Sequence, residues 1–269
     1  MSTSKLYTLS PSTTLNVVTT GDQISELSLI FLHFWGGSSR TFTQTVGHLS
    51  PFSTISIDFR GWGSSTGPAS PQDYSILHLA EDIEALLHIL ALKSFVIIGH
   101  SMGGKVAQLV AGRNHTPGLK AVVLIAPAPP TPLVLPTEMK QQQLTAYSSP
   151  ESAEFVARNV LSSSKLDDDT IRMLVQDMTT GSKFAQRAWP EYAMGEDVTE
   201  EARNIRVPVL IIAGELDKIE PEERLRVEVQ GNIEAAEMVI VKGSGHLLPV
   251  EAPEDVGRHI KEFIQRVVM

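Results

Sequence analysis

Residues 95–103 read FVIIGHSMG, and this stretch decides the fold that the rest of the chain must fit. An apolar run comes first, followed by Ser101 between Gly99 and Gly103, and then by a helix-like stretch over residues 105–112. This order predicts a strand, a sharp turn that exposes one hydroxyl, and a helix. The glycines fit the prediction because a Cβ at either position would collide with a neighbouring strand or helix. The motif alone also occurs by chance, so the flanking strand and helix are what favour a nucleophilic Ser101 over an ordinary turn serine.

The composition is typical of a globular protein with a large core. The chain has 269 residues, of which 42% are hydrophobic and 20% charged, and one α/β domain with an insertion is a better expectation than two independent domains. The net charge is −9, from 22 basic and 31 acidic side chains. Because a negative protein is repelled by nucleic acid and by anionic membranes, we expect neither as a partner.

Cysteine usage and apolar run length restrict the chemistry and the location. The chain has no cysteine, which excludes disulfides, thiolate metal sites and a cysteine nucleophile. The first ten residues lack the run of about 7–15 apolar residues that a signal peptide needs, and no run of about 18 apolar residues follows. We therefore expect a cytoplasmic protein that is not inserted in a membrane.

Short apolar runs alternate with amphipathic stretches along most of the chain. Helix-period patterns occupy residues 76–90 and 256–267, with apolar side chains on one face of each. Strands that alternate with helices predict a mostly parallel central sheet with helices on both faces. The runs that read as buried strands are 27–34, 54–59, 95–99, 121–126, 207–213 and 236–241.

The alternation stops between about residues 127 and 206. This stretch opens with several prolines and then shows only helix-like patterns, and it is too long for an unstructured connection. The sequence therefore predicts a core in two parts, 1–130 and 207–269, with a helical lid over 131–206. Its large apolar side chains either line a site beneath the lid or pack between helices; they are Met139, Leu144, Phe155, Met173, Met178, Phe184, Trp189 and Met194.

A serine hydroxyl needs a base within hydrogen-bond reach and a third group that orients this base. Of eight histidines, His246 is the best candidate for the base. It ends the flexible sequence GSGH directly after the predicted strand 236–241, and sites in open α/β sheets form at the carboxyl ends of strands. The other histidines lie in helical patterns or have simpler structural interpretations.

Asp217 is the best candidate for the acid. It follows the predicted strand 207–213 in the sequence GELD, so it reaches the same edge of the sheet as His246. Glu215 and Glu220 are nearby alternatives. A structural alternative for Asp217 itself is an N-cap of the helical segment that begins at Pro221, since aspartate is common at that position.

These motifs together resemble an α/β-hydrolase, and the resemblance covers nearly the whole chain. The serine turn, Asp217 and His246 occur in the order Ser, Asp, His, and residues 58–65 (DFRGWGSS) resemble a D-x-R-G-x-G-x-S loop. The similar group contains lid-bearing esterases, haloperoxidase-like enzymes and C–C hydrolases. From its own chemistry the 58–65 loop is structural, because Arg60 can pair with a carboxylate and the glycines permit a tight turn.

Acyl transfer also needs hydrogen-bond donors aimed at the oxygen that becomes negative. The backbone N–H of Met102 is one candidate, because it follows the nucleophile at the start of a helix. The resemblance implies that Trp35, in the sequence HFWGG of residues 33–37, supplies the second donor. Phe34 stands where the family usually has glycine, and Trp35 can equally be an apolar wall of the pocket.

The sequence thus predicts a serine hydrolase that cleaves an ester, thioester or lactone of a small, mostly apolar substrate. Ser101, His246 and Asp217 form the catalytic set, Trp35 and Met102 the oxyanion hole, and the chemistry requires no metal or organic cofactor. The resemblance also leaves open C–C bond hydrolysis, perhydrolysis, cofactor-free lyase or dioxygenase chemistry, and a receptor for small molecules. Ser101 argues against dehalogenases and epoxide hydrolases, which use an aspartate nucleophile. The oligomeric state is left open.

Overall fold

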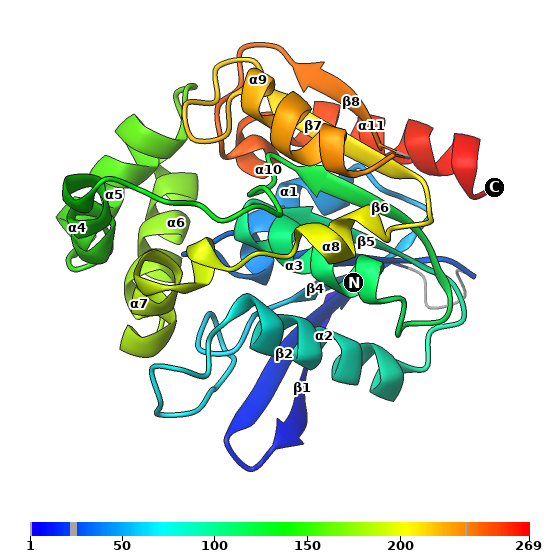
Figure 1. The fold of residues 1–269 in the computed structure, drawn as a ribbon, viewed down its shortest axis with the longest axis horizontal. Coiled ribbons are helices and arrows are strands. Elements are labelled where there is room, and N and C mark those ends of the chain that lie inside the picture. The colour runs from blue at the N-terminus through cyan, green and yellow to red at the C-terminus, as the bar shows by residue number, and fades with distance from the viewer. Residues whose placement is uncertain (1, 22–25, 235) are drawn as a thin grey trace.

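The structure is built on a sheet to which both halves of the chain contribute strands. The computed structural model describes residues 2–21, 26–234 and 236–269. Within these ranges eight strands form a sheet in the order β1-β2-β4-β3-β5-β6-β7-β8 (Figure 1). Their bounds are β1 Ser2–Ser10, β2 Thr13–Thr20, β3 Ser28–Leu32, β4 Ser53–Ile57, β5 Phe95–His100, β6 Leu119–Ile125, β7 Val209–Gly214 and β8 Ala236–Val241.

The strands from β3 to β8 all pair in parallel. They coincide with the six predicted apolar runs to within two residues at either end. Every residue of β3, β4, β5 and β7 is buried, as expected for parallel strands that are covered on both faces. The predicted mostly parallel α/β sheet is therefore confirmed.

The hairpin formed by β1 and β2 was not predicted from the sequence. These strands pair antiparallel, with Tyr7 opposite Leu15, and β2 continues antiparallel onto β4. Most of β1 is exposed, and its serine and threonine residues leave no apolar run for a buried strand to be recognised by. The hairpin adds an antiparallel edge to an otherwise parallel sheet.

Helices cover both faces of this sheet, and a separate hydrophobic cluster forms on each face. In β5, Ile97 packs in the cluster that α2 and α3 cover, whereas Val96 and Ile98 pack in the cluster that α11 covers, because successive strand residues point to opposite faces. The α-helices are α1 Thr43–Gly47, α2 Ile76–Leu90, α3 Met102–Arg113, α4 Thr137–Thr145, α5 Pro150–Phe155, α6 Asp168–Thr180, α7 Lys183–Glu191, α8 Thr199–Arg203, α9 Glu222–Arg224, α10 Leu248–Glu251 and α11 Pro253–Val267.

The stretch between β6 and β7 is helical, as predicted. Its helices α4 to α7 lie together at one end of the molecule, on the left in Figure 1. They are fastened to the loop after β3: the Ser38 hydroxyl donates to Asp177 Oδ2 (2.7 Å), and the Trp35 indole Nε1 donates to the Gln186 carbonyl (3.0 Å). The role of residues 131–206 as a lid stays a prediction of the sequence.

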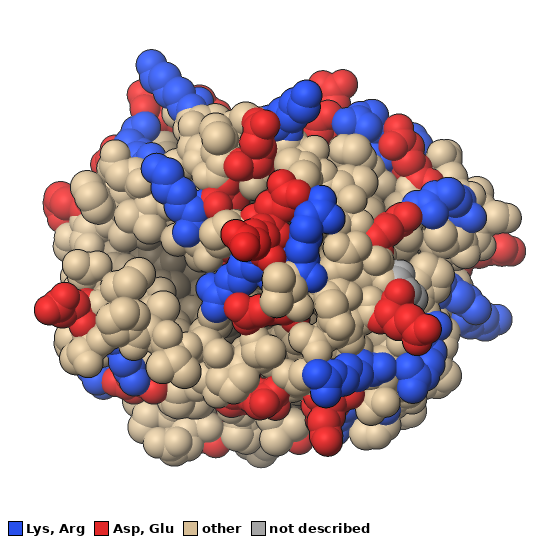
Figure 2. Space-filling model, turned by 45° about the horizontal axis from the view of Figure 1, so that its top comes forward, with Lys and Arg blue, Asp and Glu red and all other residues tan. Residues whose placement is uncertain are grey.

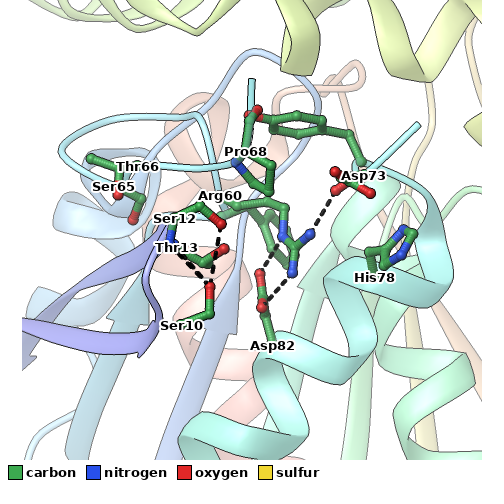
Figure 3. A network of polar contacts seen from close by, with 12 residues as sticks. Ser10, Ser12, Thr13, Arg60, Ser65, Thr66, Pro68, Asp73, His78 and Asp82 are labelled. Carbon is green, nitrogen blue, oxygen red and sulfur yellow. Dashed lines mark hydrogen bonds and ion pairs between the residues drawn. The ribbon is translucent and has the colours of Figure 1, made fainter. Parts of the chain in front are cut away.

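The 58–65 loop has the structural role that its residues indicated. The Asp58 carboxylate accepts from the backbone N–H of Ser39 (2.6 Å) and of Ser64 (2.9 Å), which fixes the loop against the segment after β3. The Arg60 guanidinium donates from Nε and Nη2 to the two carboxylate oxygens of Asp82 in α2, each at 2.6 Å, and from Nη1 to the Asp73 carbonyl (Figure 3). This pairing joins the loop to a helix of the main core.

Replacement of Arg60 by methionine should destabilise the fold. Asp82 is buried, and burial raises the pKa of its carboxyl. Removal of Arg60 therefore leaves a buried carboxyl group without the positive charge and the hydrogen bonds that stabilise its ionised form. We expect Arg60→Met to lower the free energy of unfolding by about 3–5 kcal/mol, measured by urea denaturation. Arg258→Met, which removes an exposed pair with Asp255, is the matched control and should cost less than about 1 kcal/mol. Equal losses in the two variants would contradict the assignment.

Candidate active site

Ser101 lies in the strained turn between β5 and α3. Its backbone has φ 53° and ψ −116°, a left-handed conformation that costs a residue with a side chain about 1–3 kcal/mol. The turn is held from both sides, because the Ser101 N–H donates to the Ile125 carbonyl (3.0 Å) while the Ser101 carbonyl accepts from Gly104 (2.8 Å) and Ala128 (3.0 Å). The predicted strand, turn and helix are therefore confirmed.

The glycines of the motif have the steric role that the sequence predicted. A Cβ on Gly99 would lie 2.3 Å from the carbonyl oxygen of Gly103, and a Cβ on Gly103 would lie 2.3 Å from the carbonyl oxygen of Leu32 at the end of β3. Both neighbours are backbone atoms that cannot move aside. Glycine at 99 and 103 thus lets α3 pack against the sheet directly behind Ser101.

The structure brings Ser101, His246 and Asp217 together. His246 Nε2 lies 2.9 Å from Ser101 Oγ, and His246 Nδ1 lies 2.8 Å from Asp217 Oδ2. Because a carboxylate can only accept, Nδ1 carries the proton and Nε2 is left free to accept from the serine hydroxyl. The side chains come from the ends of β5, β7 and β8, which meet at one edge of the sheet. All three are buried.

The other two acidic candidates do not contact His246. The Glu215 carboxylate accepts from the backbone N–H of Gly243 (2.9 Å), and Glu220 faces Arg224 at 3.6 Å. The N-cap interpretation of Asp217 is wrong, because α9 begins at Glu222 with Pro221 at the N-cap. The second oxygen of Asp217 instead accepts from the backbone N–H of Ile219 and of Glu220, which orients the carboxylate toward the imidazole.

Asp217 stabilises the protonated form of the His246 imidazole, which is the form produced when the imidazole accepts the serine proton. Burial lowers the pKa of the His246 imidazole, but the charge and hydrogen bond of Asp217 outweigh burial and raise this pKa overall. Burial likewise raises the pKa of the Asp217 carboxyl, and the positive charge of His246 reverses this and lowers it. Burial lowers the pKa of His100 to about 3 and raises that of Glu220 to about 8, so these two neighbours stay uncharged near neutral pH.

The two predicted oxyanion donors lie in suitable segments. Met102 is the first residue of α3 and Trp35 follows β3, and among the described residues neither backbone N–H donates a hydrogen bond to another group. The chain accommodates Phe34 in the usual glycine position because Gly37 has no side chain: a Cβ there would lie 2.7 Å from the Phe34 ring. The donor role of Trp35 and Met102 stays a prediction.

A pocket of about 480 Å³ opens beside Ser101 and His246. Four residues proposed from the sequence line it: Trp35, Met139, Phe155 and Trp189. On the left of the view in Figure 2, the surface shows a hollow that is bordered mostly by uncharged residues. Aspartate, glutamate, lysine and arginine are absent from the lining residues, which are Phe34, Trp35, Ser101, Met139, Gln142, Gln143, Thr145, Ala146, Tyr147, Ser152, Phe155, Val156, Val160, Leu161, Trp189, Ile219 and His246.

The other five suggested residues do not line this pocket; they are Leu144, Met173, Met178, Phe184 and Met194. Met178 and Met194 are buried in the main core, and Phe184 stacks on Tyr74 with ring centroids 6.3 Å apart. Tyr147 was not predicted from the sequence. Its ring packs on the Trp35 indole with ring centroids 4.2 Å apart, and its hydroxyl donates to the Trp35 carbonyl (2.8 Å). No motif marks this tyrosine, because its position depends on how the helical segment folds back.

Two properties of the described residues concern metals and membranes. None of their histidine, aspartate and glutamate side chains gather in a group of three or more that is able to hold a metal ion. Among the described helices, none combines the length and the apolar character needed to span a bilayer.

Known proteins share this sequence pattern and this fold. The bifunctional esterase/perhydrolase DCH of Acinetobacter calcoaceticus is 28% identical over 255 residues, which cover 88% of this chain and 91% of that protein. The AB hydrolase superfamily protein YisY of Bacillus subtilis is 26% identical over 246 residues, covering 87% of this chain and 90% of that protein. The structure of an esterase (EaEST) from Exiguobacterium antarcticum superposes with a TM-score of 0.84 at 19% identity, covering 94% of this chain and 96% of that one.

A sequence model of the alpha/beta hydrolase family matches residues 29–258. The match begins in β3 and ends in α11, so it contains Ser101, Asp217 and His246 together with the whole helical segment. The sheet order, the serine turn and this match agree: the chain belongs to the alpha/beta hydrolase family.

Proposed function

We propose that this protein is a serine hydrolase with Ser101 as nucleophile, His246 as base and Asp217 as the acid that orients the base. One observation carries the proposal: the continuous hydrogen-bonded chain from Ser101 Oγ through the imidazole to Asp217 Oδ2, with distances of 2.9 Å and 2.8 Å. This geometry supplies what a serine hydroxyl lacks at neutral pH, namely a base within hydrogen-bond reach.

The reaction proceeds in two steps. Ser101 Oγ adds to the carbonyl carbon as its proton passes to His246 Nε2, and the leaving alcohol or thiol takes that proton as the bond to the carbonyl breaks. Water then adds to the acyl-enzyme, giving its proton to His246, and the acid departs as Ser101 is protonated again. The backbone N–H groups of Trp35 and Met102 stabilise the negative oxygen in both steps.

The proposed substrate is a small ester, thioester or lactone with a neutral, mostly apolar acyl group. The pocket volume of about 480 Å³ lies in the range of sites for small molecules. A charged acyl group would lose hydration here without gaining an acidic or basic side chain in return, because none of the described residues that line the pocket is aspartate, glutamate, lysine or arginine. The helices of residues 131–206 supply most of this lining, which is the basis for proposing that they act as a lid.

Perhydrolysis is the second candidate, because the relative from Acinetobacter calcoaceticus is an esterase/perhydrolase. In that reaction hydrogen peroxide replaces water in the second step, and the acyl-enzyme releases a peracid. The same residues serve both reactions. Peracid formation on addition of hydrogen peroxide to the hydrolysing enzyme therefore distinguishes a dual activity from hydrolysis alone.

Replacement of the nucleophile is the direct test of the proposed function. We expect Ser101→Ala to lower kcat on a short p-nitrophenyl ester by on the order of 10⁴-fold or more with little change in thermal unfolding. The wild-type protein should be labelled covalently by a fluorophosphonate, and the variant should not. Retained turnover in Ser101→Ala would remove this residue from the mechanism, and an unlabelled, inactive wild-type protein would favour a receptor.

Asp217→Asn should reduce kcat by at least about 10²-fold, because the amide no longer fixes the imidazole tautomer or stabilises the imidazolium. Glu215→Gln is the matched control, since it makes the same chemical change on an exposed neighbour whose bond to Gly243 an amide oxygen can preserve. Steady-state kinetics on one ester compare the variants. If Glu215→Gln causes the larger loss, the acid is misassigned.

The pH dependence should report the raised pKa of His246. The imidazole acts as a base only when neutral, so kcat/KM is full above this pKa and is lost as the pH falls through it. Because Asp217 raises the pKa above the ordinary 6.5, we expect the acid limb of the kcat/KM profile to have its midpoint above pH 6.5. The residual activity of Asp217→Asn should show this limb at lower pH. A wild-type midpoint below 6.5 would mean that the pair is not formed in solution.

A further inference from the structure

Five donors converge on the Glu251 carboxylate at the end of α10. Oε2 accepts from the backbone N–H groups of Ser163 (2.9 Å), Ser164 (3.0 Å) and Gly245 (3.1 Å), and from the Ser164 hydroxyl (3.1 Å). Oε1 accepts from the backbone N–H of Leu247 (2.9 Å). Gly245 and Leu247 flank His246, whereas Ser163 and Ser164 belong to the helical segment between β6 and β7. One partly buried side chain thus joins two parts of the chain that are far apart in sequence.

Further contacts fasten the same two parts to each other. The backbone N–H of His246 donates to the Leu161 carbonyl (2.8 Å), so three consecutive amides, 245 to 247, are bound by Glu251 and Leu161. A Cβ on Gly245 would lie 2.7 Å from the Ser163 nitrogen, which shows how closely the segments approach. The Ser163 hydroxyl donates to the Leu216 carbonyl (3.0 Å), next to Asp217.

The turn that carries His246 needs such external support. Its sequence GSGH contains two glycines, Gly243 and Gly245, which have no side chains to pack and many accessible conformations. A reacting imidazole has to be held within about 0.5 Å of its productive position, and a displacement of about 1 Å can cost about 10²-fold in rate. Hydrogen bonds from amides to a charged carboxylate are stronger than those between neutral groups. Glu251 therefore adds two such bonds, from the N–H groups of Gly245 and Leu247, to the restraints on this turn.

We propose that Glu251 is a positioning residue: its carboxylate holds the turn of His246 against residues 161–164, so that the orientation of the imidazole depends on the docking of the helical segment. The proposal rests on the proposed function of His246 as the base. It also makes the segment between β6 and β7 more than a wall of the pocket, because its residues at 161–164 form part of the support of the site.

Glu251→Gln tests the proposal, with Glu254→Gln as the matched control. The control makes the same change three residues away on an exposed side chain. An amide offers one acceptor oxygen in place of two and brings an NH₂ group against the amide donors. We expect Glu251→Gln to lower kcat by about 10–100-fold with little change in KM, and the control to leave both unchanged.

Two further readouts separate positioning from a merely structural or electrostatic role. The proton between His246 Nδ1 and Asp217 gives a far-downfield NMR resonance, which should shift or broaden in Glu251→Gln and stay in place in Glu254→Gln. Glu251→Asp keeps the negative charge but shortens the side chain by one methylene. A positioning role predicts a slow Glu251→Asp enzyme with a displaced resonance, whereas a purely electrostatic role predicts wild-type behaviour.

The outcomes are distinguishable from a failure of the proposed function. Unchanged kcat and an unmoved resonance in Glu251→Gln would overturn the inference, and so would wild-type behaviour of Glu251→Asp. If Glu251→Gln does not fold, Glu251→Asp carries the test, since it retains charge and acceptors. The resonance does not require turnover: if the wild-type protein hydrolyses no ester but the resonance still moves in the Glu251 variants, the positioning role stands and only the proposed function fails.

Discussion

The left-handed backbone at Ser101 is the constraint on which the site depends. A serine with φ 53° is unfavourable by itself, and it persists because β6, the start of α3 and Ala128 all bind its backbone. Those bonds exist only when β5 lies inside the parallel sheet and α3 packs closely behind it. The strain therefore ties the exposure of one hydroxyl to the assembly of the whole core, and the carboxyl ends of β7 and β8 then bring Asp217 and His246 to the same edge.

The parts of this arrangement that could be predicted from the sequence are those with a local signal. The buried strands β3 to β8 leave apolar runs, and the serine turn, GELD and GSGH each follow such a run. Strand β1 leaves no such signal because it is polar and largely exposed at the sheet edge. The pocket lining was only partly predictable, since Trp189 and Phe184 share one short helix and only Trp189 reaches the pocket. Which face of α7 turns inward is set by tertiary packing rather than by residue type.

The helical segment between β6 and β7 is also bound to α3, in addition to its contacts beside His246. The Lys105 ammonium in α3 is buried and donates to the carbonyls of Thr131 (3.0 Å) and Met194 (3.1 Å), which lie near the two ends of the segment. Burial lowers the pKa of this lysine to about 8. The ammonium therefore stays mostly charged at neutral pH, although burial has removed much of its hydration. The backbone N–H of Leu133 also donates to the Met194 carbonyl. Since both ends are joined to one side chain of the helix that follows Ser101, the segment and the serine turn share a common support.

The distribution of charge explains why only Asp217 pairs with His246 although three acidic side chains lie in the loop after β7. Glu215 is exposed, where water screens its field, and burial raises the pKa of Glu220 to about 8, which leaves it mostly uncharged at neutral pH. Asp217 is buried as well, but two backbone N–H groups and the imidazole stabilise its ionised form. The field at the imidazole is therefore dominated by the group that is hydrogen bonded to it. The direction of that bond, rather than the number of acids in the loop, sets which nitrogen of His246 faces Ser101.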